Sequence, residues 1–447
     1  MSLLGAERLA EATAPALAGA ADGILVIATH AAGGLTRFAN SRIHQNTWRE
    51  DVEIRVLAVA DGGRTGVAST RALGPDQVSR AAADALAIAR VGRPDPSFPG
   101  LATPAPFAAP DRYDEQTAET SPAERASAVE AALSEFPGGM EGAGHVETVA
   151  DEVYVTSTTG VACYGRLTRA GVSVMAMAET SSGFAELLEA RLSDLDPSAI
   201  AARAVRKAEI GRDPRPIEPG AYTVVLEPAA TSTLMQFLAW LGFGAKSLLE
   251  ERSFLTGRIG QKVMHDSITI TDDPVAHDAL GLPFDFEGTP AHPVTLVEGG
   301  VARSVVWDRT TAAREGRDST GHGLPPPNPD GPFPLNLRMQ PGRSSLDDLV
   351  AGCERGLLVT RFHYSNVVNE KETVLTGMTR DGTFWIEDGK VRHGVRNLRY
   401  TQNALEALSS VEGVGDTTEI SSELFFGGSR APALRIRDFK FSSVTDH

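Results

Sequence analysis

The chain has 447 residues, of which 42% are hydrophobic and 22% are charged, and its formal net charge at pH 7 is -16. This composition is typical of a globular protein with sizeable cores, and the length predicts two domains rather than one. The negative charge argues against non-specific binding to nucleic acids or anionic membranes, because both need basic patches on the protein.

Cysteine content and the N-terminal segment predict the compartment. Cys163 and Cys353 are the only cysteines, so the sequence predicts no disulfide framework and a reducing environment. Glu7 and Arg8 interrupt the first apolar run, which favours a short amphipathic helix over a secretory leader. No stretch approaches the roughly 20 apolar residues of a membrane span. We therefore expect a cytoplasmic protein that binds neither membranes nor nucleic acids.

The first part of the chain predicts a mixture of strands and helices. Apolar and alternating patterns predict strands over residues 24–29, 39–46 and 52–60, followed by a hairpin turn over residues 61–64. A stripe of apolar side chains predicts a helix over residues 75–91. This order of elements indicates a mixed α/β domain at the N-terminus.

The segment that follows adds a capped helix and a domain boundary. Ser121 and Glu124 have capping-box spacing, which predicts a helix that begins there and reaches about residue 136. Strands are predicted at about residues 145–156 and 170–178, and a helix at about residues 197–210. Three prolines within residues 213–219 indicate an extended linker. The predicted domains are therefore residues 1–213 and residues 214–447.

Short strands and turns dominate the second half. Residues 222–226 predict a strand that runs directly into a helix opened by Pro228. Residues 295–301 and 384–391 each predict a hairpin, and the proline-rich residues 325–334 predict an irregular loop. The expected fold class is α+β, with an N-terminal mixed α/β domain and a C-terminal β-rich domain.

Several later segments carry a family resemblance. Residues 252–274, 283–323, 335–342 and 415–439 resemble, in order and approximate spacing, the PmbA/TldE branch of the TldD/PmbA (TldD/TldE) family of zinc peptidases. Residues 38–70 add a weaker similarity to the opening strands of that family. The resemblance covers most of the C-terminal half.

The strand-to-helix junction departs from the active members of that family. They carry His-Glu-x-x-x-His there, which supplies two zinc ligands and a general base. In this sequence Glu227 and Ser232 stand in the ligand positions, and Pro228 replaces the general base. The family's third ligand is a cysteine near the C-terminus, and residues 418–423 contain none. Because a catalytic zinc site needs three ligands and a carboxylate that accepts a proton, we expect no catalytic residues and no metal or other cofactor in this chain.

The resemblance implies a role in a complex. We expect the chain to be a non-catalytic subunit that forms a heterodimer with a TldD-type subunit, which holds the zinc and cleaves small or unfolded peptides, including modified peptide natural products. Residues 252–273 and 295–301 are candidate strand edges for such a peptide. Two alternatives stay open: a self-sufficient hydrolase with a relocated site that uses Glu227, His322 and His363, or a homodimeric peptide-binding module without chemistry.

Four side chains are candidates for facing the peptide or the partner: Arg252, His322, His363 and Asn366. His322 lies in a glycine-flanked loop, where the backbone can approach a ligand closely. His363 and Asn366 follow a strand predicted over residues 357–362. Two other pairs, His265-Asp266 and His277-Asp278, are interpreted as structural or surface residues, because neighbouring residues on a strand point to opposite faces. Asp272-Asp273-Pro274 is interpreted as a turn that closes a strand over residues 267–271.

Overall fold

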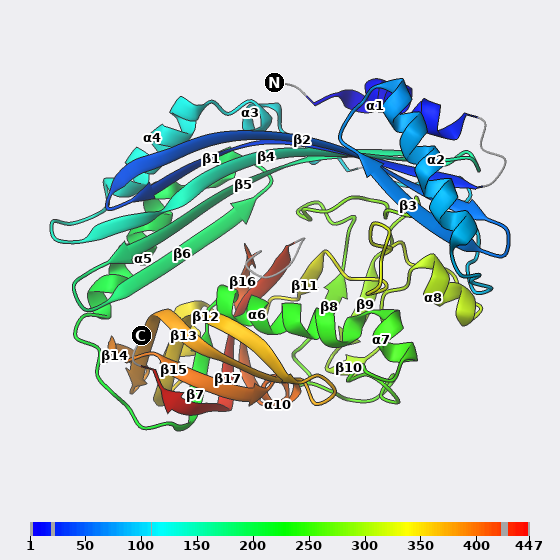
Figure 1. Cartoon of the computed structure of the whole chain (residues 1–447). Coiled ribbons are helices and arrows are strands. Elements are labelled where there is room, and N and C mark those ends of the chain that lie inside the picture. The colour runs from blue at the N-terminus through cyan, green and yellow to red at the C-terminus, as the bar shows by residue number, and fades with distance from the viewer. Residues whose placement is uncertain (1–2, 19–22, 109, 422–427, 446–447) are drawn as a thin grey trace.

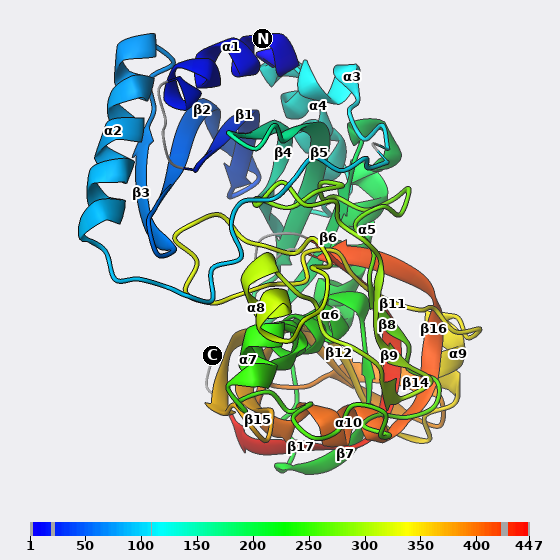
Figure 2. The ribbon, with the colours of Figure 1, turned by 90° about the vertical axis from the view of Figure 1, so that its right-hand side faces the viewer.

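The computed structural model describes residues 3–18, 23–108, 110–421 and 428–445. Two bodies lie one above the other (Figure 1): a long curved sheet covered by helices on its outer face, and a second sheet with helices that faces its inner side. The view turned by 90° shows the same two layers from the side (Figure 2). Over these residues no helix is both long and apolar enough to cross a membrane.

The N-terminal body is an antiparallel six-stranded sheet in the order β3-β2-β1-β4-β5-β6. Its strands are β1 (Ile24–Ala39), β2 (Arg42–Ala60), β3 (Arg64–Thr70), β4 (Glu141–Ser157), β5 (Ala162–Met177) and β6 (Ser182–Glu189). Its helices are α1 (Gly5–Leu17), α2 (Pro75–Val91), α3 (Glu115–Ala118), α4 (Pro122–Leu133) and α5 (Pro197–Ile210), with a 3₁₀ turn at Leu192–Asp194. Two apolar clusters hold the helices to the sheet, one under α1 and α2 and one under α4 and α5.

The C-terminal body is built on an eleven-stranded sheet. Its strands are β7 (Gly220–Leu226), β8 (Ile270–Asp272), β9 (Val294–Glu298), β10 (Val301–Ala302), β11 (Leu337–Met339), β12 (Arg355–Asn369), β13 (Val374–Glu387), β14 (Lys390–Gly394), β15 (Leu398–Asn403), β16 (Val411–Ser421) and β17 (Ser429–Val444). Its helices are α6 (Pro228–Leu238), a π-helical turn at Ala239–Phe243, α7 (Ala245–Leu249), α8 (Arg309–Arg314), α9 (Leu346–Ala351) and α10 (Ala404–Ser409). The largest apolar cluster of the molecule lies here, around α6.

Strand β7 and helix α6 lie at the centre of this body. β7 pairs in parallel with β12 and antiparallel with β17, so both of its edges are occupied. Every residue of α6 except Ala229 is buried, because the helix packs on the sheet while other segments cover its outer face. The residues at the β7–α6 junction are therefore held rigidly from several sides.

The expected α+β fold class is confirmed. The helices predicted over residues 75–91 and 197–210 match α2 and α5 residue for residue. The capping box of Ser121 and Glu124 is present at the start of α4, although the helix ends at Leu133. Gly62 and Gly63 have positive φ angles of 75° and 71° in the predicted hairpin turn, a conformation that glycine adopts without strain.

Several predicted strand limits were wrong. β1 extends to Ala39 rather than residue 29, because strands on both of its sides hydrogen-bond a segment whose small residues gave a weak pattern. β8 begins at Ile270 and includes Asp272, which we had interpreted as part of a turn. His265 and His277 lie outside strands, so the argument from opposite strand faces does not apply to them.

The candidate strand edges for peptide addition also need correction. β8 pairs with both β9 and β11, and β9 pairs with both β8 and β10. β10 ends the sheet, and Lys262 forms a bridge with Val301 on that strand. Within residues 252–273 only Ile270–Asp272 form a strand, and both edges of that strand are paired, as are both edges of β9 in the second segment. The short local pattern did not reveal this pairing.

Candidate functional site

The β7–α6 junction faces the N-terminal body across an interdomain contact. Glu227, directly after β7, is the N-cap residue of α6. Its carboxylate lies 2.5 Å from the ammonium of Lys207 on α5, and the two side chains are only 6% and 12% exposed. Lys207 also donates a hydrogen bond of 2.9 Å to the carbonyl of Phe184 on β6. A cation from one domain therefore neutralises the first position of the degenerate motif in the other.

A second ionic contact lies beside it. Arg203, one helical turn before Lys207 on α5, binds Glu419 on β16 at 2.8 Å. Since residues four apart share one face of a helix, both cations point towards the C-terminal body. The face of α5 that points away from its own domain thus carries two cations, and each binds one carboxylate of the C-terminal body.

The hydroxyl group of Ser232 also has hydrogen-bond partners within the C-terminal body. It lies one turn along α6, and its hydroxyl is 2.9 Å from the hydroxyl of Ser429 on β17. The amide of Gln236 donates to Ser232 Oγ at 3.0 Å and to the carbonyl of Ser421 at 3.2 Å. All four residues are buried. This network ties α6 to β16 and β17.

The residues at the junction do not fit a zinc ion. A cation already neutralises Glu227, Ser232 offers a neutral hydroxyl held by other groups, and Pro228 has no acid-base group. Thr418–Ser421 of the C-terminal stretch lie in β16, whereas residues 422–423 lie outside the described residues. In the described ranges no group of three or more His, Cys, Asp and Glu residues could hold a metal ion. No step of a reaction is therefore assigned to zinc in this chain.

A small cavity separates the two bodies elsewhere in the interdomain contact. It has a volume of about 270 Å³ and a mostly apolar lining from β1, β4 and β5 above and from the loops of the C-terminal body below. His322 lines it and is 6% exposed. Its Nε2 lies 2.8 Å from the carboxylate of Asp272, which also accepts from the backbone N–H of Asn336 at 2.7 Å. The glycine-flanked loop is therefore anchored from below, with His322 at the cavity wall.

Two carboxyl groups near this cavity have perturbed acidity. Asp285 is buried, which raises its pKa to about 6 although backbone N–H groups of Gly323, Thr289 and Glu287 donate to it. Enclosure raises the pKa of the Glu287 carboxyl to about 8, and the charges of Asp285 and Asp308 act in the same direction. Glu287 accepts from the backbone N–H of Arg309 at 2.9 Å. This region holds carboxyl groups without a matching cation in direct contact.

The other predicted site residues lie away from the junction. Arg252 is half exposed and binds the carboxylate of Glu250 at 2.7 Å. His363 and Asn366 lie inside β12, which continues to Asn369 instead of ending at residue 362. Burial and the nearby cations Arg380 and Arg361 lower the pKa of His363. The structure therefore does not bring Arg252, His322, His363 and Asn366 together with Glu227 in one site.

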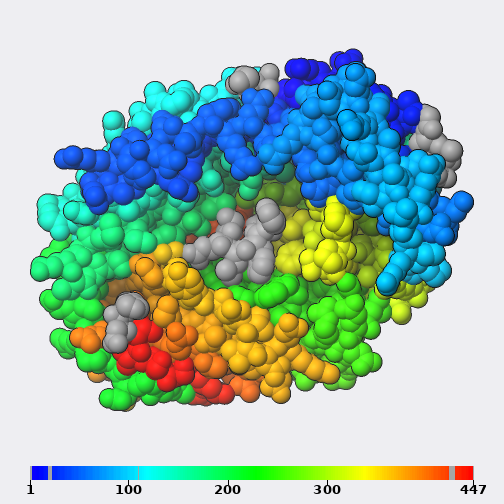
Figure 3. Space-filling view, viewed as in Figure 1, coloured from blue at the N-terminus to red at the C-terminus, as the bar shows by residue number. Residues whose placement is uncertain are grey.

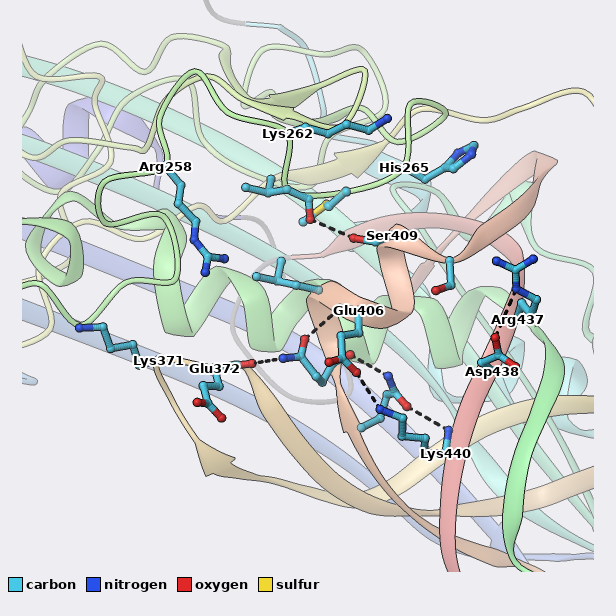
Figure 4. A pocket seen from close by; sticks show the side chains of 16 residues that line it. Arg258, Lys262, His265, Lys371, Glu372, Glu406, Ser409, Arg437, Asp438 and Lys440 are labelled. Atoms are coloured by element: carbon cyan, nitrogen blue, oxygen red, sulfur yellow. Dashed lines mark hydrogen bonds and ion pairs between the residues drawn. The ribbon is translucent and has the colours of Figure 1, made fainter.

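A broad hollow lies on the C-terminal body around α10 (Figure 4). Its volume is about 1000 Å³, and basic side chains in it face acidic ones. Lys440 binds Glu406 at 2.8 Å, and Arg437 lies 3.3 Å from Asp438. Charges of both signs line the hollow, and this mixture does not single out one chemical class of ligand.

Sequence reasoning missed the residues that decide the state of the junction. Lys207 and Arg203 lie on the polar side of an ordinary amphipathic helix, so no local signal separates them from solvated charges. Asp272 was assigned to a turn, and Asp285 and Glu287 were not considered. Only tertiary contacts identify these five residues. Lys207 and Arg203 bind across the two domains, whereas Asp272, Asp285 and Glu287 have their partners within the C-terminal body.

Comparison with known proteins identifies the family. Family models of the PmbA/TldA metallopeptidase match the chain, the central domain over residues 112–212 and the C-terminal domain over residues 219–443. The C-terminal match alone covers half of the chain. The chain belongs to the PmbA/TldD family. A metalloprotease of Methanothermobacter thermautotrophicus is 26% identical over 230 residues, covering 49% of this chain and 50% of the relative.

Other members of the PmbA/TldD family are similarly distant. A metalloprotease TldD homologue of Buchnera aphidicola is 27% identical over 217 residues, covering 48% of this chain and 44% of the relative. The chain therefore spans about half the length of these curated relatives. TldE from Thermococcus kodakarensis has a TM-score of 0.86 at 21% identity, covering 98% of this chain and 99% of that one. A structure described as a putative modulator of a DNA gyrase, from Thermotoga maritima, has a TM-score of 0.85 at 22% identity, with the same coverage. These likenesses establish the fold.

Proposed function

We propose that this chain is a non-catalytic, TldE-like subunit that pairs with a TldD-type zinc metallopeptidase in the cytoplasm. The observation that carries the proposal is the ion pair between Lys207 and Glu227, which places an ammonium group at the first position of the degenerate motif. A metal ion there would have to displace a buried cation of the same sign. Zinc and the water that it activates belong to the partner subunit, and this chain helps to enclose an extended peptide.

The interdomain groove supports the enclosing role. Figure 3 shows the molecule hollowed between the two bodies, with the N-terminal sheet above and β12 and β13 below. Ser182 on β6 donates to Asp381 on β13 at 2.7 Å, and Arg55 on β2 donates to the carbonyl of Pro326 at 3.1 Å. Such contacts at both ends hold the walls of the groove at a fixed separation. A fixed groove suits an extended peptide that is cleaved by a second subunit.

The two alternatives have less support. A relocated hydrolytic site would need Glu227, His322 and His363 to converge, and each instead has separate partners: Lys207, Asp272 and the ring of Tyr364. A homodimeric peptide-binding module remains compatible with the same groove. The proposed heterodimer requires a subunit with an intact motif, whereas the homodimeric module does not.

Zinc content and peptide hydrolysis test the proposal. The purified chain is assayed alone, mixed with a TldD-type subunit from the same genome, and mixed with that subunit after alanine replaces both histidines of its His-Glu-x-x-x-His motif. A short unstructured peptide is the substrate, and a chelator is the control. We expect no zinc and no cleavage from the chain alone, chelator-sensitive cleavage from the first mixture, and none from the second. Stoichiometric zinc or turnover in the chain alone would overturn the proposal.

A further inference from the structure

The small cavity between the two bodies has an apolar interior. Four side chains of the C-terminal body line it and are only half-buried: Leu280, Leu282, Phe286 and Leu335. Leu167 and Leu188 of the six-stranded sheet line it from the other side. At about 270 Å³, it is slightly smaller than the roughly 300–1,000 Å³ of pockets that bind drug-sized molecules. Its size and its lining therefore suit one large apolar group.

The charged side chains of the lining already have partners within the chain. The ion pairs are His322 with Asp272, His30 with Glu152, and Arg169 with Asp151, at 2.8, 2.8 and 2.9 Å. The carboxyl group of Asp285 accepts hydrogen bonds from three backbone N–H groups. A charged group that entered the cavity would lose its water without gaining a counter-ion. The lining therefore favours an uncharged guest.

Asn336 brings an unpaired polar group to the same lining. The residue is 8% exposed, and within the described part of the chain its side-chain amide has no hydrogen-bond partner. Its backbone is fixed on both sides, because its N–H donates to Asp272 at 2.7 Å and its C=O accepts from the N–H of Asp273 at 3.1 Å. A Cβ atom added at Gly281 would collide with Oδ1 of Asn336, so the amide is held closely against that glycine. A buried amide donor and acceptor are therefore held in place without a partner.

The free amide and the apolar lining together define the chemistry of the guest. Buried polar groups in native proteins are almost always hydrogen-bonded, so a group that is left unpaired in a cavity points to a ligand that pairs with it. A side-chain amide accepts through its oxygen and donates through its NH₂ group, and a peptide group offers the matching N–H and C=O. A peptide residue with an apolar side chain satisfies both the amide of Asn336 and the apolar walls.

We propose that this cavity is a specificity pocket that receives one large apolar side chain of the peptide, while the amide of Asn336 pairs with the adjoining peptide group. The inference rests on the proposed function, because the guest belongs to the peptide that this chain helps to enclose. Arg169 and Asp151 of the lining are 38% and 26% exposed, so the cavity reaches solvent beside them and the rest of the peptide extends from that side. The pocket selects peptides with a residue such as leucine or phenylalanine.

A peptide series tests the pocket without any substitution. The full chain alone is titrated with acetylated and amidated pentapeptides Ala-Ala-Xaa-Ala-Ala, in which Xaa is leucine, phenylalanine, alanine, aspartate or lysine, and binding is followed by ligand-observed NMR. We expect the leucine and phenylalanine peptides to bind at least about tenfold more tightly than the alanine peptide, because they bury more apolar surface. The two charged peptides should bind no more tightly than the alanine peptide. Equal Kd values across the series, or no binding of the leucine and phenylalanine peptides, would overturn the inference.

Substitution of Asn336 tests the contact with the peptide group. Asn336→Leu removes the amide with little change in side-chain size, and Asn46→Leu makes the same change at an exposed position of β2 as the control. We expect Asn336→Leu to raise the Kd of the leucine and alanine peptides alike by about tenfold, because both contain the peptide group, and the control to change it by less than about twofold. Thermal unfolding verifies that both variants are folded. Unchanged Kd values in the folded Asn336→Leu variant would remove Asn336 from the pocket.

A substitution that fills the cavity gives a test that does not depend on Asn336. Thr29 on β1 lines the cavity and is half-buried, so Thr29→Phe places a ring in the space that the guest needs. We expect this variant to bind the leucine and alanine peptides with Kd values within about twofold of each other, whereas the unmodified chain prefers leucine. A preference for leucine that survives Thr29→Phe in a folded chain would show that the side chain binds elsewhere.

The outcomes separate this inference from the proposed function. Chelator-sensitive cleavage by the mixture with a TldD-type subunit, together with equal binding of all five peptides by the chain alone, rejects the pocket and leaves the partnership intact. Preference for the leucine and phenylalanine peptides in a chain that does not pair with that subunit supports the pocket and rejects the partnership. The pocket would then belong to a peptide-binding module without chemistry.

Discussion

Two parts of the interdomain contact hold their carboxyl groups in opposite ways. At the β7–α6 junction, Glu227 has Lys207 as a direct counter-ion, and Glu419 has Arg203. Near the small cavity, the carboxyls of Asp285 and Glu287 are surrounded by backbone N–H groups and by other carboxylates. In the first part, each carboxylate has a cation of the other domain in direct contact. In the second part, the carboxyl groups keep their protons to higher pH, and a neutral carboxyl group costs less free energy to bury than a charged one.

This difference shows two ways in which one fold accommodates carboxyl groups between its two bodies. A buried carboxylate without metal would be strongly destabilising, because removing a charge from water costs several kcal/mol. Lys207 supplies the positive charge from the neighbouring domain, and it also links the two domains. The junction is therefore a structural contact between the domains, whereas the carboxyl groups of Asp285 and Glu287, with their raised pKa values, make the other region sensitive to pH.

The largest expected effect follows removal of the cation at the junction. Lys207→Met should lower the free energy of unfolding by about 3 kcal/mol, because it leaves the Glu227 carboxylate buried without a counter-ion. The measurement is the urea-unfolding free energy at pH 7. The double variant Lys207→Met/Glu227→Gln should recover most of the loss, since no charge remains buried. A loss below about 1 kcal/mol in the single variant would contradict the contrast between the two regions.

The second prediction concerns the unmatched carboxyl group. The pKa of Glu287 is raised to about 8 in the folded chain from an ordinary value of 4.5, so its contribution is fully present below pH 4.5 and is lost as pH rises through 8. Glu287→Gln should remove this loss and raise the stability at pH 8.5 by roughly 1 to 2 kcal/mol relative to the unmodified chain, with little effect at pH 5. Thermal unfolding across this pH range measures it.

The control for this prediction is Glu298→Gln, at a side chain that is 61% exposed. It should leave the pH dependence of thermal unfolding unchanged, because this side chain is in contact with water both in the folded and in the unfolded chain. If the stability change caused by Glu287→Gln is as independent of pH as that of this control, the proton on Glu287 does not contribute to the stability of the folded chain.

A smaller effect is expected from the hydroxyl network at the junction. Ser232→Ala should lower the unfolding free energy by about 1 kcal/mol, because Ser429 and Gln236 lose a buried hydrogen-bond partner. Ser79→Ala, on the exposed face of α2, is the matched control and should be neutral or slightly stabilising. Equal unfolding midpoints in urea for Ser232→Ala and the unmodified chain would show that this network carries no net stability.

The smallest effect on stability is expected at an exposed ion pair. Arg252 and Glu250 are 51% and 44% exposed, so Arg252→Ala should change the unfolding free energy by less than about 0.5 kcal/mol. Its role as a peptide- or partner-facing residue predicts instead a weaker complex with the TldD-type subunit or a higher KM for the peptide. A stable variant with unchanged binding and unchanged KM would remove Arg252 from the candidate site.

Local patterns predicted much of the fold and little of the site. Helix α5 was predicted residue for residue because its apolar stripe and its N-terminal Pro197 are local signals. Strand β1 was predicted too short, because pairing with β2 and β4 stabilises small residues that have weak strand preference on their own. The loss of the motif was visible at Glu227, Pro228 and Ser232, since it depends only on which residues stand there.

The sequence by itself determined that this chain is built from the PmbA/TldD pattern and that Glu227, Pro228 and Ser232 stand at the β7–α6 junction. The tertiary structure alone decided which side chains contact them. Lys207 stands 20 residues before Glu227 in the chain and on another domain, and Asp272 stands 50 residues before His322, yet each pair is in direct contact. Periodicity and capping act over a few residues, whereas these pairings depend on how segments far apart in the chain come together in the tertiary structure.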